Sequence, residues 1–165
     1  MSRVIPVKYF DEKMPKLKKL KQGDWIDLSV RDIQVADYGL VNPIILDNEH
    51  GWDVYNGEST PMVIKVKFGI AMELPSGKEA HIVPRGSTFK NYLMTLANNV
   101  GIVDNSFCGP DDEWWGNFVV HGSFEMEKYA RVAQFKIVDK MPHYDFLTVD
   151  ELHGDNRGSE GSTGL

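Results

Sequence analysis

Residues 63–71 read VIKVKFGIA, and this stretch gives the clearest indication of the fold. Its β-branched and apolar residues alternate with polar ones, which is typical of a strand with one buried face. Short segments of the same kind recur along the chain, and turn signals such as Pro75-Ser76-Gly77 separate them. They are Ile5–Tyr9, Ala80–Pro84, Gly101–Val103, Asn117–His121 and Arg131–Val138. Many short strands with such punctuation predict an all-β fold of the sandwich or barrel type.

Two other segments need a separate interpretation. The spacing of apolar residues in Phe89–Asn99 suits a short helix, although a strand also fits. Residues 42–61 are bracketed by two prolines and read as an insertion. Because this insertion carries apolar residues of its own, we expect it to form a hairpin rather than a loose loop.

The composition indicates a globular chain of one domain. Hydrophobic residues make up 42% and charged residues 25% of its 165 residues, which is ordinary for a soluble protein. The last eleven residues, 155–165, are rich in Gly, Ser and Thr, and such segments behave as flexible coil. We therefore expect a folded domain at 1–154 and a flexible C-terminal tail at 155–165.

Charge and hydropathy exclude several classes of partner. A net charge of −6 argues against broad binding to nucleic acid, which needs a basic surface. No apolar run approaches the ~20 residues of a membrane helix, and the N-terminus lacks the apolar region of a signal peptide. Cys108 is the single cysteine, so an internal disulfide is excluded. These features predict a cytoplasmic protein that binds neither nucleic acid nor membrane.

Several polar side chains lie at the ends of the predicted strands, and each alone has a structural explanation. Asp27 is typical of a residue that caps a turn, and a solvent-facing side chain is the default for Gln134. Together, however, these side chains match the groups that bind a nucleoside triphosphate and its metal ion. Asp27 is a hard oxygen ligand that suits Mg²⁺, and Asp104 can orient or deprotonate a water. The candidate phosphate donors are Arg85, Ser87, Gln134 and Arg157.

The order and spacing of five stretches resemble the trimeric dUTPase (deoxyuridine triphosphate nucleotidohydrolase) family. Gly23–Leu28 resembles the first family motif, Pro84–Thr88 the second and Asn98–Phe107 the third. Arg131–Phe135 resembles the fourth motif, and Arg157–Gly164 resembles the fifth, which ends in "GSTG". The match spans nearly the whole chain, and five motifs in order are far more specific than any one alone.

The resemblance implies a fold and a reaction. The family fold is a β-barrel of the jelly-roll type, and it assembles as a homotrimer in which the C-terminal tail of one subunit reaches over a site formed by the others. The reaction is hydrolysis of dUTP to dUMP and pyrophosphate with Mg²⁺ on the triphosphate, which keeps uracil out of DNA. Water attacks the α-phosphorus, and the implied partners are dUTP and two further copies of the chain.

The resemblance also implies roles for individual residues. Asp104 activates the attacking water, Asp27 holds the metal through water, and Phe107 stacks under the deoxyribose. Residues implied at the phosphates are Arg85, Gly86, Ser87, Gln134, Arg157, Gly161, Ser162 and Thr163. Residues implied at the uracil are Asn98, Gly101, Ile102 and Val103.

Three departures from the family pattern affect the site. Gly86 stands where the second motif usually has Ser, and Phe107 stands where the third usually has Tyr. The fifth motif is shortened, as in dUTPases of some Gram-positive bacteria and their phages, and lacks the Phe that covers the uracil. The candidate aromatic lids are Trp115 and Trp114, which point opposite ways if the segment is extended.

Alternative functions remain open at this stage. The chain is also compatible with a dUTPase-like protein that acts through a protein partner bound at the insertion 42–61, or with an inactive jelly-roll subunit. The dCTP deaminases often have Phe where this chain has Phe107, but those enzymes need a glutamate seven residues later. Trp114 occupies that position here, and Glu113 lies one residue too early, which makes a deaminase the less favoured reading.

Overall fold

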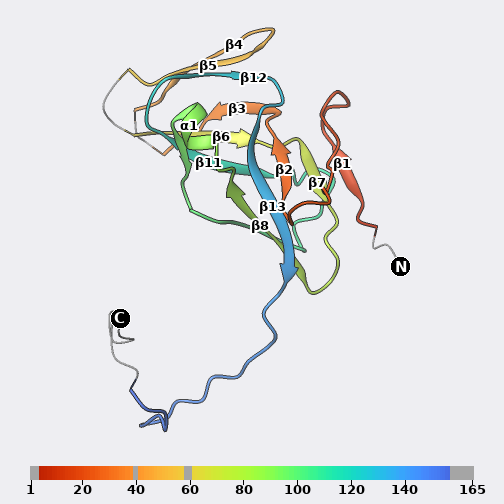
Figure 1. Cartoon of the computed structure of the whole chain (residues 1–165), viewed down its shortest axis with the longest axis vertical. Coiled ribbons are helices and arrows are strands. Elements are labelled where there is room, and N and C mark those ends of the chain that lie inside the picture. The colour runs from red at the N-terminus through yellow and green to blue at the C-terminus, as the bar shows by residue number, and fades with distance from the viewer. Residues whose placement is uncertain (1–3, 39–40, 58–60, 157–165) are drawn as a thin grey trace.

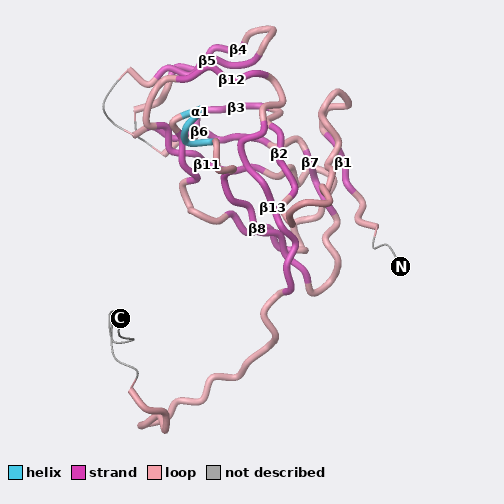
Figure 2. Tube along the Cα trace, in the orientation of Figure 1, coloured by secondary structure: helices cyan, strands magenta, loops and turns pink. Residues whose placement is uncertain are grey.

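The computed structural model describes residues 4–38, 41–57 and 61–156, which are almost entirely strands and connecting loops (Figures 1 and 2). Within these ranges the strands pair antiparallel. The first four-stranded sheet has the order β10 (Gly101–Asp104), β8 (Lys78–Pro84), β13 (Arg131–Asp139) and β2 (Ile26–Ser29). The second has the order β3 (Asp32–Val35), β6 (Met62–Lys67), β11 (Trp115–Val120) and β9 (Met94–Leu96). The all-β prediction is confirmed.

Two smaller sheets and a short helix complete the described structure. A three-stranded sheet has the order β12 (Phe124–Glu127), β5 (Gly51–Tyr55) and β4 (Ile44–Asp47), and β1 (Val7–Tyr9) pairs with β7 (Ile70–Met72). The helix α1 spans Thr88–Tyr92. In the described part of the chain, no helix has the length and apolar character needed to cross a membrane.

Side chains from both four-stranded sheets meet in one hydrophobic core. Leu28 and Phe135 come from the first sheet, Ile64 and Phe118 come from the second, and all four are almost completely buried. Trp114, in the loop before β11, is also fully buried and packs edge to face on Phe135, with ring centroids 5.2 Å apart. Burial of large apolar side chains of this kind is the main favourable contribution to folding.

The stretch at 63–71 that predicted a single strand is divided between two sheets. β6 ends at Lys67 and β7 begins at Ile70, and the two strands have different partners. Gly69 lies between them with a φ of +65°, and a Cβ at this position would lie 2.1 Å from the Met14 sulfur. The chain bends there because only glycine combines this backbone conformation with so close a neighbour.

The two ambiguous segments also have defined structures. Phe89–Asn99 contains both of the alternatives considered, since it includes most of α1 and then β9, and Leu93 ends the helix in a left-handed conformation with a φ of 46°. The expected hairpin within 42–61 consists of β4 and β5. Its inner side chains Trp52 and Val54 are buried in the core, so the hairpin is packed against the rest of the fold.

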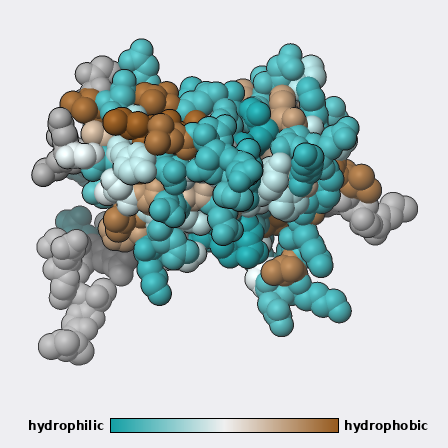
Figure 3. All heavy atoms as spheres, turned by 90° about the horizontal axis from the view of Figure 1, so that it is seen from above, coloured by the Kyte–Doolittle hydropathy of each residue, from teal (hydrophilic) through white to brown (hydrophobic). Residues whose placement is uncertain are grey.

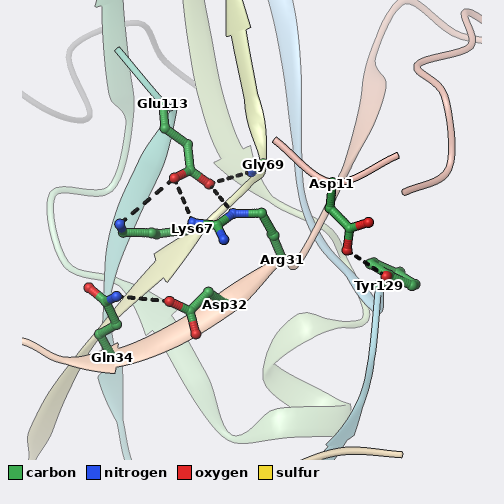
Figure 4. A network of polar contacts seen from close by, with 8 residues as sticks. All are labelled: Asp11, Arg31, Asp32, Gln34, Lys67, Gly69, Glu113 and Tyr129. Atoms are coloured by element: carbon green, nitrogen blue, oxygen red, sulfur yellow. Dashed lines mark hydrogen bonds and ion pairs between the residues drawn. The ribbon is translucent and has the colours of Figure 1, made fainter. Parts of the chain in front are cut away.

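A buried carboxylate ties the loop before β11 to the bend after β6. Glu113 accepts hydrogen bonds from Arg31 Nε at 2.6 Å and Nη2 at 2.8 Å, and from the backbone N–H of Gly69 at 3.0 Å (Figure 4). Lys67 Nζ lies 3.7 Å from the same carboxylate. The bond to Glu113 raises the pKa of Arg31 above its usual range. Paired and hydrogen-bonded in this way, the nearly buried Glu113 charge is tolerated.

We expect Glu113→Ala to lower the free energy of unfolding by about 2–3 kcal/mol, because it leaves Arg31 without its carboxylate and Gly69 without its acceptor. Urea unfolding of the full chain at fixed protein concentration measures this loss. Asp111→Ala is the matched control, since Asp111 is 95% exposed and its pair with Lys8 is 3.6 Å long. The control should change stability by less than about 0.5 kcal/mol, and equal losses in both variants would contradict the assignment.

Candidate active site

A cavity of about 810 Å³ opens beside strand β10. Many of the residues singled out from the sequence line it, and they come from β10, from the turns on either side of it, and from the start of β11 with the residue before it. These residues are Asn98, Gly101, Ile102, Val103, Asp104, Phe107, Trp114 and Trp115. Segments that are separate in the sequence therefore form one concave surface.

The backbone around Asn98 is shaped by a tight turn between β9 and β10. Asn99 has a φ of 58°, a conformation that asparagine adopts more readily than most residues, and its N–H bonds to the carbonyl of Leu96 at 3.1 Å. Gly101 then enters β10 opposite Ile82, and a Cβ there would lie 3.3 Å from the Ile82 Cβ. A side chain larger than hydrogen would crowd this position, where the backbone faces the cavity.

Asp104 ends β10, and both of its carboxylate oxygens have donors. The N–H of Ser106 bonds to Oδ1 at 2.7 Å, and Lys140 forms an ion pair with Oδ2. The bond from Lys140, followed by those from Ser106, lowers the pKa of Asp104 to about 2. The carboxylate is therefore ionised at neutral pH, and any stability that its ionised form contributes is lost only as the pH falls from about 4 toward that value.

The two neighbouring tryptophans face opposite ways, as the sequence predicted. Trp114 is fully buried against Phe135, so this side chain belongs to the core and is not a free lid. Trp115 is 46% exposed at the edge of the cavity, with Lys65 Nζ 4.6 Å from its ring centroid. Of the two candidates, only Trp115 presents an accessible aromatic face.

A second group of predicted residues gathers where β2, β8 and β13 lie side by side. Asp27 is opposite Gln134 in the pairing of β2 with β13. Arg85 Nε lies 2.8 Å from Asp27 Oδ1, and Arg131 Nη1 lies 3.0 Å from Oδ2. Gln134 is half-buried, and its amide nitrogen lies 3.4 Å from the carbonyl oxygen of Pro84.

Gly86 and Ser87 follow Arg85 and lead into α1. A Cβ at Gly86 would have no heavy atom within 4 Å, so space alone does not require glycine there. Ser87 precedes α1 without capping it through its hydroxyl. Neither residue lines the 810 Å³ cavity, and neither do Asp27, Arg85 and Gln134. The remaining predicted residues, Arg157, Gly161, Ser162 and Thr163, lie outside the described residues.

Comparison with known proteins assigns the family. The chain is 36% identical over 163 residues to a deoxyuridine 5'-triphosphate nucleotidohydrolase of the SPbeta prophage of Bacillus subtilis, covering 97% of each chain. It is 31% identical over 124 residues to the enzyme of that name from Tropheryma whipplei, covering 72% of this chain and 84% of the relative. The chain belongs to the dUTPase family. No protein-family model matches it.

Solved dUTPase structures share the fold. The dUTPase of Staphylococcus bacteriophage 80alpha, solved as a mutant with dUpNHpp, superposes with a TM-score of 0.65 at 15% identity, covering 99% of this chain and 100% of that one. The dUTPase of Streptococcus mutans superposes with a TM-score of 0.59 at 18% identity, covering 90% of this chain and 100% of that one. These likenesses confirm the predicted dUTPase-type β fold.

The described residues of this dUTPase hold no cluster of three or more side chains that could ligate a metal ion by themselves. Asp27 is the predicted metal residue, and two guanidinium groups already occupy its oxygens. A single carboxylate of this kind suits Mg²⁺, which retains several waters and uses few protein ligands. Phosphate oxygens and water would then supply most of the ligands, and Asp27 would act through a water molecule.

Sequence reasoning missed several residues of the dUTPase site. Lys140 contacts Asp104 from a position 36 residues away, and Arg131 contacts Asp27 from 104 residues away. Tyr38 and Asn117 line the cavity and are hydrogen-bonded to each other. Only Arg131 had a signal, since it begins the fourth motif; the others depend on strand pairing and loop paths that no local pattern specifies.

We expect Asp27→Asn to lower the free energy of unfolding by about 1 kcal/mol, because a partly buried charge-assisted contact with Arg85 and a more exposed one with Arg131 are weakened. Urea unfolding in the presence of EDTA measures the change without metal effects. Asp24→Asn is the control, since Asp24 is 66% exposed and its pairs with Lys19 and Lys136 are 3.7 and 3.4 Å long. The ion-pair assignment fails if the two variants lose the same stability.

Proposed function

We propose that this member of the dUTPase family hydrolyses dUTP to dUMP and pyrophosphate, with Asp104 activating the water that attacks the α-phosphorus. The observation that carries the assignment of Asp104 is its place at the end of β10, on the wall of the 810 Å³ cavity. Its pKa of about 2 keeps it ionised, so it accepts a hydrogen bond from water at neutral pH.

The cavity supports binding of the nucleoside. We assign the amide of Asn98 and the backbone of Gly101, Ile102 and Val103 to the uracil edge, because backbone donors and acceptors fix the orientation of a small polar ring. Phe107 supplies a flat apolar face for the deoxyribose. Its backbone N–H bonds to the carbonyl of Asp104 at 3.0 Å, which fixes the spacing between sugar and water sites.

The phosphate-binding residues support a site shared between subunits. Asp104 is opposite Glu79 at the start of β8, whereas Arg85 follows the last residue of that strand. A strand rises about 3.3 Å per residue, so Arg85 lies on the order of 20 Å along the sheet from Asp104. Phosphates at Asp104 are thus out of reach of Arg85, Gly86, Ser87 and Gln134 of the same chain, and we assign these four to the site of a neighbouring copy.

The segment after β13 also supports a homotrimer. Residues 140–156 contain no helix or strand and lead away from the sheets (Figure 1). Met141, Phe146, Leu147 and Leu152 in this arm are each at least 75% exposed. Contact with another subunit would bury this apolar surface, and it would carry the tail 155–165, with Arg157, Gly161, Ser162 and Thr163, to the neighbour's phosphates.

Phosphoryl transfer depends on positioning and charge neutralisation more than on covalent chemistry. When bound, Mg²⁺ supplies positive charge to the triphosphate oxygens. The residues of this chain would align the reacting groups. Arg85 and Gln134 would hold phosphate oxygens, Asp27 fixes Arg85 and would help to hold the metal, and Asp104 would hold the nucleophilic water. A cytoplasmic location follows as part of this proposal, since dUTP is an intracellular nucleotide.

Partner binding through the insertion 42–61 is a second candidate function. Ile44 and Tyr55 lie opposite each other on the hairpin and, with Leu46, are at least 47% exposed. In the view from above, hydrophobic side chains gather on part of the surface among hydrophilic ones (Figure 3). The deaminase alternative has less support, because Glu113 is held by Arg31 and Gly69 and does not line the cavity.

Pyrophosphate release from dUTP, dCTP, dTTP and UTP with Mg²⁺ tests the proposed function. We expect release from dUTP alone, and we expect Asp104→Asn to lower the rate by at least about 100-fold, since general-base catalysis contributes on this scale. Asp111→Asn, at a 95% exposed position outside the cavity, is a charge-matched control that should keep full activity. Release from dCTP or undiminished release by Asp104→Asn would overturn the assignment.

We expect Trp115→Ala to raise the KM for dUTP about tenfold and to leave the fold intact, because an aromatic lid contributes stacking energy to the bound base. Steady-state kinetics with circular dichroism measures both effects. Tyr55→Ala is the matched control, since Tyr55 is 47% exposed against 46% for Trp115 and lies on the insertion. An unchanged KM in Trp115→Ala would exclude the lid.

A further inference from the structure

Lys140 reaches Asp104 from a fixed backbone position. It directly follows β13, and its N–H bonds to the carbonyl of Gly77 at 2.9 Å. This bond continues the pairing of β13 with β8 by one further residue, since Asp139 is already opposite Lys78. From there the side chain, 31% exposed, forms the ion pair with Asp104 Oδ2.

Two residues hold the plane of the Asp104 carboxylate. Ser106 binds Oδ1 from the turn that follows β10, and Lys140 binds Oδ2 from the end of β13. An ionised carboxylate has about four lone-pair sites, and Lys140 together with the N–H and hydroxyl of Ser106 supplies three donors, so at least one lone pair is left for a water molecule. The carboxylate is 48% exposed, which leaves room for that water.

The other charged groups near Asp104 do not provide a second cation. Glu79 lies directly opposite Asp104 across β10 and β8, and residues opposite each other share a face of the sheet. His81, two residues further along β8, is 2.6 Å from Glu79 Oε1. On β13, Val138 is opposite Glu79 and Lys136 is opposite His81. Lys78 is paired with Asp139. Among the described residues, Lys140 is the cation that contacts Asp104.

We propose that Lys140 is a positioning residue for catalysis, which holds the Asp104 carboxylate in the orientation that receives the attacking water. This inference rests on the proposed role of Asp104. Lys140 does not itself transfer a proton. It fixes one oxygen so that the other lone pairs have a constant direction, and misplacement of a catalytic group by about 1 Å can cost on the order of 100-fold in rate.

The same geometry sets the lower limit of the active pH range. The Lys140 bond is the largest cause of the low pKa of Asp104. Without it, Asp104 keeps its bonds from Ser106 but loses the largest cause of its low pKa. The pKa of Asp104 should then rise toward the ordinary value of an aspartate, so that the carboxylate protonates at a higher pH than in the wild type.

The test compares Lys140→Met and Lys140→Arg with Lys78→Met. Methionine keeps the length and apolar stem of lysine but removes the ammonium, whereas arginine keeps a cation. Lys78→Met is the matched control, because it removes a neighbouring lysine and the ion pair with Asp139 without contact to Asp104. The readouts are kcat and KM for dUTP at pH 7.5, and the titration of the Asp104 carboxyl carbon by ¹³C NMR between pH 3 and 7, with Asp104→Asn for assignment.

For Lys140→Met we expect kcat to fall about tenfold with KM within about twofold of wild type, because orientation of the base is lost while substrate contacts remain. Its Asp104 signal should titrate within the measured range, whereas that of wild type and Lys78→Met should stay constant above pH 3. Lys140→Arg should restore most of kcat and the low pKa. Circular dichroism at each pH confirms that the proteins are folded.

Two results would overturn the inference: an Asp104 titration in Lys140→Met identical to that of wild type, or a kcat loss that Lys78→Met reproduces. The NMR titration is independent of turnover, so it reports on the ion pair even without activity. If Asp104→Asn still hydrolyses dUTP at the wild-type rate, the proposed catalytic role of Asp104 is wrong. A shifted titration in Lys140→Met would then show that the ion pair exists but that it has no role in catalysis.

Discussion

Strand β8 is hydrogen-bonded along both edges, to β10 and to β13, and the rest of the candidate site depends on this double pairing. The sheet order β10-β8-β13-β2 places the third, second, fourth and first family motifs on or directly beside adjacent strands. Residues distant in the sequence, such as Asp27 and Gln134, thereby become direct neighbours. Because backbone hydrogen bonds fix the register, each of these side chains has a defined height along the sheet.

The same register keeps two parts of the site apart. Asp104 and Glu79 are at one end of β8, and Arg85 is beyond the other end, where it meets Asp27. A sheet does not bend enough over a few residues to bring its two ends together. If Arg85 and Asp104 act on one triphosphate, as we propose, the arginine must come from a second copy of the chain, and assembly then becomes a requirement of the chemistry.

Sequence patterns predicted those features that depend on residues close together in the chain. Alternation in Arg131–Val138 and the turn chemistry at Pro75-Ser76-Gly77 identified strands, and the opposite directions of Trp114 and Trp115 follow from extended backbone. The bend at Gly69 was missed because the neighbours that restrict this position, such as Met14, come from distant parts of the sequence. Lys140 was missed for the same reason, since its contact with Asp104 exists only once β13 pairs with β8.

The segment Glu113–Trp115 connects the buried ion pair with the edge of the cavity. The bonds from Arg31 and Gly69 hold Glu113 inside, and the chain then continues through buried Trp114 into β11, where Trp115 is opposite Lys67. Side chains alternate along an extended backbone, so burial of Trp114 places Trp115 outward at the cavity edge. The ion pair therefore fixes the backbone directly ahead of the residue whose burial leaves Trp115 at the cavity edge. An apolar residue of similar size would often be as stable as this carboxylate, but it could not accept the N–H of Gly69 and the guanidinium of Arg31 at once.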